Sequence, residues 1–168
     1  MGIGFFRSPF METYVQDPIL TLTEDADPAL REQIAAVLVR YNEAQVGVHE
    51  RRPLLIVVRD PKTNAVIGGL AGRTALGLLF IDLFALPMDL RGQGLGTRLL
   101  HMAEEEARKR GCRAVALNSA SFQAPDFYER RGYRVLGEVE GDPGIKRIFM
   151  AKDLNQASRT EAAPAAVE

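Results

Sequence analysis

The sequence predicts one α/β domain in which short strands alternate with helices. Across residues 19–154, apolar runs of strand type and stretches of helical spacing follow in the order β, α, β, β, β, α, β, α, β, β. The chain has 168 residues, of which 46% are hydrophobic and 26% charged, enough to bury one core. We expect the domain at 17–155, after a leader of uncertain order at 1–16 and before a disordered tail at 156–168.

The first elements follow from capping residues and apolar spacing. Residues 19–23 form an alternating apolar run that predicts a first strand. Asp27 before Pro28 is typical of a helix start, and the helical apolar spacing that follows fades over 42–47, which is compatible with helix or loop.

The middle of the chain predicts three strands. Residues 54–59 and 65–74 flank the turn cluster 60–64 and should form a hairpin. Residues 78–86 are more apolar, as expected of a central strand covered on both faces.

A second helix follows a glycine turn and ends at Gly111. Its apolar face repeats every four residues, while Glu104, Glu105 and Glu106 each have a basic residue four positions on and should form a charged outer face. The remaining elements are a strand at 113–119, a short helix at 125–131, and a closing hairpin of 133–139 with 146–154.

The glycine turn Arg91-Gly92-Gln93-Gly94-Leu95-Gly96 leads from the apolar strand directly into this helix. Glycine lets another group approach the main chain, and the first amides of a helix have no internal partners, so the turn is suited to bind an anion. Thr97 and Arg98 leave the first turn free of carboxylates, and Arg91 adds a guanidinium suited to phosphate. A tight turn without a ligand is the open alternative, whereas the spacing fits neither a P-loop nor a dinucleotide fingerprint.

The turn and a second segment resemble the GNAT N-acetyltransferase superfamily. The family pattern Arg/Gln-x-x-Gly-x-Gly/Ala matches Arg91, Gly94 and Gly96. Residues 118–133 resemble the family's second cofactor segment, which ends in Ala-x-x-Phe-Tyr-x-x-x-Gly-Tyr/Phe. With the order of elements, the resemblance covers about residues 19–154.

The resemblance implies a mixed sheet of about six to seven strands, splayed near its middle, with acetyl-CoA bound at the splay. The pantetheine arm would run beside the end of strand 78–86. The implied cofactor-binding residues are Phe84, Ala85, Leu86, Arg91, Gly92, Gln93, Gly94, Leu95, Gly96, Thr97 and Asn118.

The resemblance also assigns catalytic roles. Tyr128 would be the general acid that protonates the coenzyme sulfur, since a phenol can donate to a forming thiolate. Asp82 is the candidate base, on the same face as Phe80 and Phe84 if the strand alternates regularly. A structural aspartate near a strand bulge is the alternative for Asp82, and a hydrogen-bonded strand end is the alternative for Asn118.

The other reactive side chains predict no metal site. His49 and His101 lack partner spacing for metal, and the single cysteine, Cys112, is typical of a small buried residue in a reducing compartment. We therefore expect a cytoplasmic protein. A net charge of −1 and the lack of a long apolar run predict no nucleic-acid or membrane partner.

The sequence leaves the acceptor open. We expect an N-acetyltransferase that moves an acetyl group directly to the primary amine of a small molecule in a ternary complex. A protein or peptide amine, an acetyl-CoA-binding module without turnover, and a domain with an unoccupied turn are the alternatives. Because family members often pair, the resemblance also leaves a homodimer open.

Overall fold

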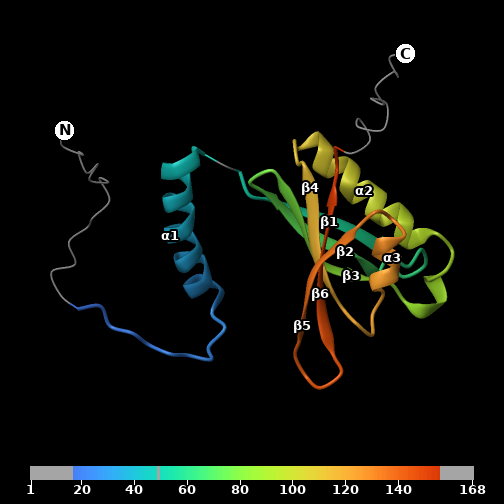
Figure 1. Cartoon of the computed structure of the whole chain (residues 1–168), viewed down its shortest axis with the longest axis horizontal. Helices are drawn as coiled ribbons and strands as arrows, with labels where there is room; N and C mark the ends of the chain where they lie inside the picture. The colour runs from blue at the N-terminus through green and yellow to red at the C-terminus, as the bar shows by residue number, and fades with distance from the viewer. Residues whose placement is uncertain (1–16, 49, 156–168) are drawn as a thin grey trace, which may run out of the picture. The chain divides into compact units, whose positions relative to one another are not determined.

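The computed structural model describes residues 17–48 and 50–155, so the expected leader and tail and His49 lie outside the described residues. The chain divides into two compact units, with the boundary in the sequence between Gln45 and Val46 (Figure 1). The single domain expected at 17–155 therefore stays a prediction. Within the described residues, no helix has the length and apolar character needed to cross a membrane.

The first unit contributes one helix, α1 (Pro28–Val46). Asp27 caps it as predicted, because its side chain accepts a hydrogen bond from the Ala29 amide at 2.9 Å. The helix continues through the stretch that was compatible with helix or loop. The predicted strand at 19–23 is wrong: residues 17–27 have no regular secondary structure, since no described strand pairs with their backbone.

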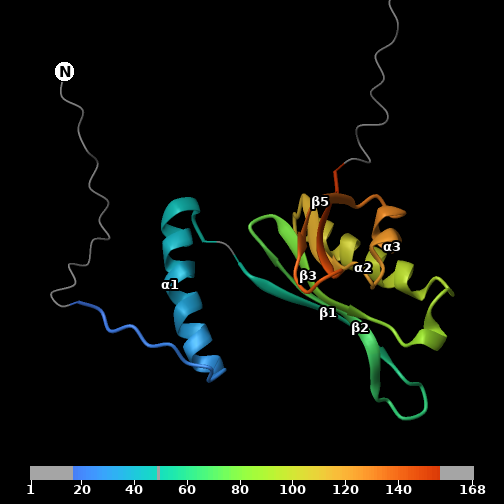
Figure 2. The same cartoon turned by 60° about the horizontal axis from the view of Figure 1, so that its bottom comes forward.

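The second unit is a six-stranded sheet with two helices and a short 3-10 turn (Figures 1 and 2). The strand order is β1-β2-β3-β4-β6-β5, and only the central β3–β4 pair is parallel. The sheet is therefore mixed, as expected. The strands are β1 (Arg52–Arg59), β2 (Val66–Ala75), β3 (Leu78–Ala85), β4 (Ala114–Ala120), β5 (Arg134–Glu140) and β6 (Lys146–Asp153).

The sheet splays between β3 and β4. The two strands pair only from Leu78 with Ala114 to Ile81 with Leu117. Beyond that point β3 continues to Ala85 beside β2, and β4 continues beside β6, so the two halves of the sheet part. The expected central splay is confirmed.

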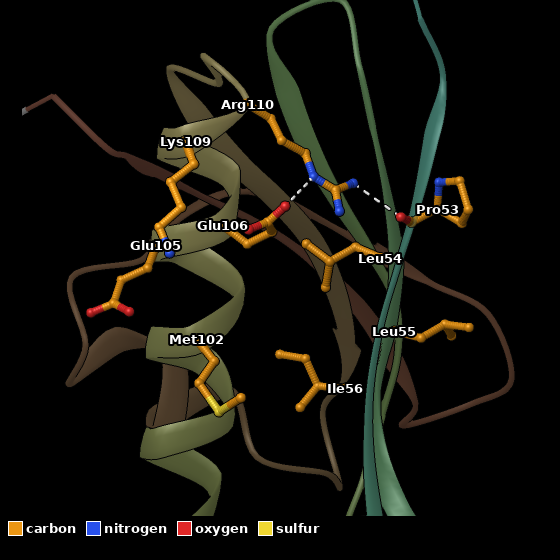
Figure 3. A pocket seen from close by; sticks show the side chains of 9 residues that line it. All are labelled: Pro53, Leu54, Leu55, Ile56, Met102, Glu105, Glu106, Lys109 and Arg110. Carbon is orange, nitrogen blue, oxygen red and sulfur yellow. Dashed lines mark hydrogen bonds and ion pairs between the residues drawn. The ribbon is translucent and has the colours of Figure 1, made fainter.

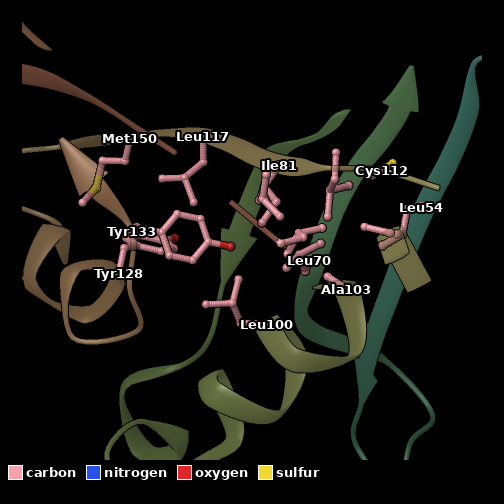
Figure 4. Close-up of a cluster of buried hydrophobic side chains, with 14 of the residues drawn as sticks. Leu54, Leu70, Ile81, Leu100, Ala103, Cys112, Leu117, Tyr128, Tyr133 and Met150 are labelled. Atoms are coloured by element: carbon pink, nitrogen blue, oxygen red, sulfur yellow. The ribbon is translucent and has the colours of Figure 1, made fainter. Parts of the chain in front are cut away.

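Helices α2 (Leu95–Lys109) and α3 (Pro125–Glu129) lie on one face of the sheet (Figure 2). Side chains from α2, α3 and five strands form one buried cluster, part of which Figure 4 shows. The face of α2 that the four-residue repeat predicted is buried, with Ala103 and Ala107 fully enclosed. This packing fixes the start of α2 against the splayed end of β3.

The charged face expected on α2 is only partly correct. Glu106 pairs with Arg110 at 2.7 Å, but the Glu104 side chain is 1% exposed. The carboxylate of Glu104 accepts hydrogen bonds from the Tyr133 hydroxyl at 3.1 Å and from the Lys152 ammonium at 2.8 and 2.9 Å. The i,i+4 spacing could not reveal these partners, because both come from the far end of the chain.

Candidate active site

The glycine turn adopts the strained backbone that its composition predicted. Gly94 is the N-cap of α2 with φ of 81°, in the left-handed region that favours glycine. An added Cβ at Gly94 would meet no protein atom within 4 Å, so the space beside the turn is open. Gly96 serves a different purpose, because an added Cβ would lie 3.3 Å from the Phe127 ring.

The first amides of α2 are available to an external anion. The first helical hydrogen bond runs from the Arg98 amide to the Gly94 carbonyl at 3.1 Å, so the amides before Arg98 have no partner within the helix. No acidic residue lies in the first turn. The positive end of the helix dipole therefore faces the open space beside the turn.

Two side chains brace the turn from within. The Nε of Arg91 donates to the Leu86 carbonyl at 3.0 Å, which fixes the guanidinium beside the end of β3. The Gln93 side chain donates to the Asp89 carbonyl at 2.9 Å. The Arg91 side chain is thus anchored to the end of β3, and the Gln93 side chain is anchored to the main chain just before the turn.

A cavity of about 820 Å³ connects the glycine turn with the splay of the sheet. Its walls come from the end of β3, the turn, the first turn of α2, the end of β4 and α3. Of the predicted cofactor and catalytic residues, those that line it are Phe84, Ala85, Leu86, Arg91, Gly92, Gly94, Gly96, Thr97 and Tyr128. Those that do not line it are Gln93, Leu95, Asn118 and Asp82.

Tyr128 is held at this cavity by aromatic packing. Its ring makes edge-on contacts with Phe84, Phe127 and Tyr133, with centroids 6.4, 5.1 and 5.7 Å away. Figure 4 shows the tyrosine pair, Tyr128 and Tyr133, within the buried cluster. Tyr128 is 9% exposed, and burial raises the pKa of its phenol to about 12. The phenol is therefore neutral, and able to donate a proton, throughout the physiological range.

Tyr128 lines the cavity, and its hydroxyl forms no hydrogen bond with a described residue. Because no fully buried side-chain polar atom among the described residues lacks a partner, this hydroxyl is accessible to solvent. The neighbouring Tyr133 hydroxyl, in contrast, donates to Glu104. The two buried tyrosines thus differ, because only Tyr133 donates its hydroxyl to a described residue.

Asp82 lies at a β-bulge, the setting given by its structural alternative, and not in a regularly alternating strand. Gly72 pairs with Ile81 and Ala71 with Leu83, so Asp82 is the extra residue. The bulge reverses the alternation, and Phe84 joins the core beside Tyr128. The expected shared face of Asp82, Phe80 and Phe84 is therefore wrong.

The side chain of Asp82 forms an ion pair with Arg73, which also lies 4.9 Å from the centre of the Phe80 ring. The Asp82 side chain is 50% exposed. The carboxylate thus remains accessible on the face of the sheet away from α2.

Asn118 faces the same side as Asp82. Each follows the last β3–β4 pair, Ile81 with Leu117, whose side chains are buried in the core. Since successive side chains of a strand alternate, Asp82 and Asn118 form the two lips of the splay away from α2. The Oδ1 of Asn118 accepts a hydrogen bond from Arg147 at 3.2 Å.

Several residues of the cavity were not identified from the sequence. Ser119, rather than its neighbour Asn118, lines the cavity from β4. Gln123 also lines it and accepts a hydrogen bond from the Ala120 amide at 2.9 Å, which shapes the loop before α3. Strand alternation could have indicated Ser119, whereas Gln123 carries no comparable signal.

A second cavity, of about 550 Å³, lies between β1 and α2 (Figure 3). Figure 3 shows Arg110 reaching from α2 to Glu106 and to the Pro53 carbonyl, which accepts at 3.0 Å. The lining of this cavity includes Glu105 and Glu106 but neither a glycine turn nor a tyrosine. The described residues also contain no cluster of three or more metal-binding side chains. We therefore assign the chemistry to the first cavity.

A splayed mixed sheet, an open glycine turn at the start of a helix and a neutral phenol at the splay are the features expected of an acyl-CoA-dependent acyltransferase. The chain belongs to the GNAT acetyltransferase family, whose acetyltransferase (GNAT) domain matches residues 23–154. It is accordingly an N-acetyltransferase with acetyl-CoA as its donor.

Individual relatives agree with this assignment. An acetyltransferase of Agrobacterium fabrum is 42% identical over 118 residues, which cover 70% of this chain and 85% of the relative. The blasticidin-S acetyltransferase of Streptomyces morookaense is 33% identical over 138 residues, or 80% of this chain and 94% of the relative. The crystal structure of an acetyltransferase from Bacillus cereus is 32% identical, with a TM-score of 0.66, and covers 79% of this chain and 97% of that one.

Proposed function

We propose that this enzyme transfers the acetyl group of acetyl-CoA directly to the primary amine of a small molecule, within a ternary complex. The observation that carries the proposal is Tyr128, a neutral phenol that lines the cavity at the splay and whose hydroxyl forms no hydrogen bond with a described residue. Acetyl-CoA supplies an acetyl group activated as a thioester. The turn, Arg91 and the end of β3 are our candidates to hold it.

Transfer requires two proton movements. The amine nitrogen bonds to the acetyl carbon and the carbon–sulfur bond breaks, so one proton leaves the amine and one reaches the sulfur. We assign the second proton to Tyr128, whose pKa of about 12 keeps it protonated at neutral pH. We assign the first to Asp82 or to water beside it, since this carboxylate is accessible on the opposite face of the splay.

Direct transfer is supported by the surroundings of the single cysteine. Cys112 is 5% exposed, lies in the core cluster and does not line the cavity. Burial raises the pKa of its thiol, which disfavours the thiolate needed for a covalent acetyl-enzyme. The unpaired thiol also fits the reducing cytoplasm that we propose as its location.

A small-molecule acceptor is supported by the relative named for blasticidin S. It is also supported by the two residues at the lips of the splay away from α2. The anionic Asp82 on one lip can attract a cationic amine, and the polar Asn118 lies on the other.

The decisive experiment measures free coenzyme A release from acetyl-CoA with a panel of acceptors. The panel contains blasticidin S, diamines, amino acids and a peptide with a free N-terminus, and mass spectrometry identifies each product. We expect a single acetyl addition to small amines and intersecting initial-rate lines when both substrates are varied. Parallel lines would exclude the ternary complex, and acetylation of the peptide alone would exclude the small-molecule class.

A further inference from the structure

Two consecutive arginines at the end of α3 line the cofactor cavity without an assigned role. Arg130 and Arg131 join Arg91 in its lining, which contains no aspartate or glutamate. Neither Arg130 nor Arg131 has a carboxylate within 4.0 Å among the described side chains. This wall of the cavity is therefore cationic and uncompensated.

The guanidinium of Arg131 is fixed in place. Its Nε donates to the Thr97 hydroxyl at 3.1 Å, a second nitrogen also donates to Thr97, and a third donates to the Phe127 carbonyl at 2.6 Å. It also stacks 3.7 Å from the centre of the Phe127 ring. Because a guanidinium has five N–H donors and both acceptors here are neutral, part of its hydrogen-bonding capacity and its whole charge remain available.

The position of this charge is unfavourable without a ligand. Thr97 lies in the first turn of α2, where the helix dipole is positive and no acidic residue offsets it. Burial and the neighbouring charge of Arg130 both lower the pKa of Arg131, so the two guanidiniums lie close enough to repel one another. An external anion would relieve both conflicts.

Coenzyme A offers two such anions, a pyrophosphate and the 3′-phosphate of its adenosine. The amides of the glycine turn and Arg91, anchored to Leu86 beside β3, suit the pyrophosphate. Arg130 and Arg131 lie on the α3 side of the cavity, where Phe122 also exposes its ring to solvent. We infer that Arg130 and Arg131 bind the 3′-phosphate, so that the enzyme distinguishes coenzyme A from 3′-dephospho-coenzyme A. This inference depends on the assignment of this cavity to acetyl-CoA.

The test is isothermal titration of the purified enzyme with coenzyme A and with 3′-dephospho-coenzyme A, without acceptor. The wild type should bind coenzyme A about ten- to a hundredfold more tightly, the range expected for charged hydrogen bonds to one phosphate. Arg130→Gln and Arg131→Gln should each reduce this ratio severalfold and leave the affinity for the dephospho form nearly unchanged. Arg98→Gln is the matched control. It removes a positive charge from the first turn of α2, beside Thr97, at a residue that does not line the cavity.

Each alternative result has a distinct meaning. Equal wild-type affinity for the two ligands, or equal weakening of both by the two substitutions, would overturn the 3′-phosphate assignment and leave the cofactor site intact. Failure of the wild type to bind either ligand would refute the cofactor site itself. Arg131→Gln also removes contacts to Thr97 and Phe127, so a thermal melt checks its fold. Arg130→Gln removes no side-chain hydrogen bond to a described residue.

Discussion

Tyr128 and Tyr133 are both buried, and their ring centroids lie 5.7 Å apart. Substituting each one separates the proposed chemical role of a hydroxyl from its contribution to stability. Tyr128→Phe removes a hydroxyl that bonds to no described residue and keeps the ring contacts with Phe84 and Phe127. We expect the free energy of unfolding to change by less than about 1 kcal/mol. If Tyr128 is the acid, kcat should fall about 10²- to 10⁴-fold, which corresponds to about 3–5 kcal/mol of activation free energy.

Tyr133→Phe is the matched control and should give the opposite result. It removes a hydrogen bond to the buried carboxylate of Glu104, at a cost of about 1.5–3 kcal/mol in the free energy of unfolding. The melting temperature should fall by roughly 5–10 °C. At temperatures well below that melting point, kcat should remain close to the wild-type value.

The assays are coenzyme A release at saturating acetyl-CoA and acceptor, thermal melting, and the pH dependence of kcat. Since the pKa of Tyr128 is about 12, its ionisation should cause no fall in wild-type kcat below about pH 11. The raised pKa also implies that wild-type stability falls as the pH rises from 10 towards 12, a loss that Tyr128→Phe should reduce. Unchanged kcat in Tyr128→Phe on a good acceptor would refute the acid role.

Three further predictions concern the turn, the buried carboxylate and the acceptor side. Gly94→Val should abolish coenzyme A binding measured by calorimetry. Gly77→Val in the β2–β3 turn, where φ is a similar 75°, should cause comparable backbone strain and still bind. Retained binding in Gly94→Val would contradict the anion site. Glu104→Gln should lower the free energy of unfolding, measured by urea titration, by about 2–4 kcal/mol. The control Glu105→Gln, at an exposed position, should change it by less than about 0.5 kcal/mol. Equal urea midpoints for the two variants would disprove the stabilising role of the buried Glu104 contacts. Asp82→Asn should raise KM for a cationic amine or lower its kcat severalfold while the fold tolerates the lost surface ion pair, and identical kinetics would assign Asp82 a structural role alone.

The sequence by itself determined the features that depend on near neighbours in the chain. Gly92 and Gly94 have positive φ, a conformation that glycine adopts without steric strain. The glycines alone therefore indicated the turn, without any tertiary contact. Asp27 caps α1 through an amide two residues away, and the apolar repeat of α2 identified its buried face. Tyr128 was identified as a candidate from the residue pattern of one short segment, 118–133.

Only the tertiary structure decided which side chains meet across distant segments. A bulge beside β2 changes the face of every later residue of β3, so Phe84 moves beside Tyr128 and away from Phe80. The helical spacing predicts a surface charge at Glu104, whereas β6 places Lys152 against its buried carboxylate. A helical or strand period describes one element, whereas the partner of each face depends on pairing and packing between elements.

The same distinction applies to the cavity. The segment containing Thr97 and the segment containing Arg131 were each recognisable in the sequence, but their hydrogen bond spans 34 residues and exists only because α3 packs beside the start of α2. Local sequence thus specified the glycine turn and the phenol. Packing of α2 and α3 on the splayed sheet placed them in one cavity and added the cations that no local pattern could assign, because charge compensation depends on neighbours in space rather than in sequence.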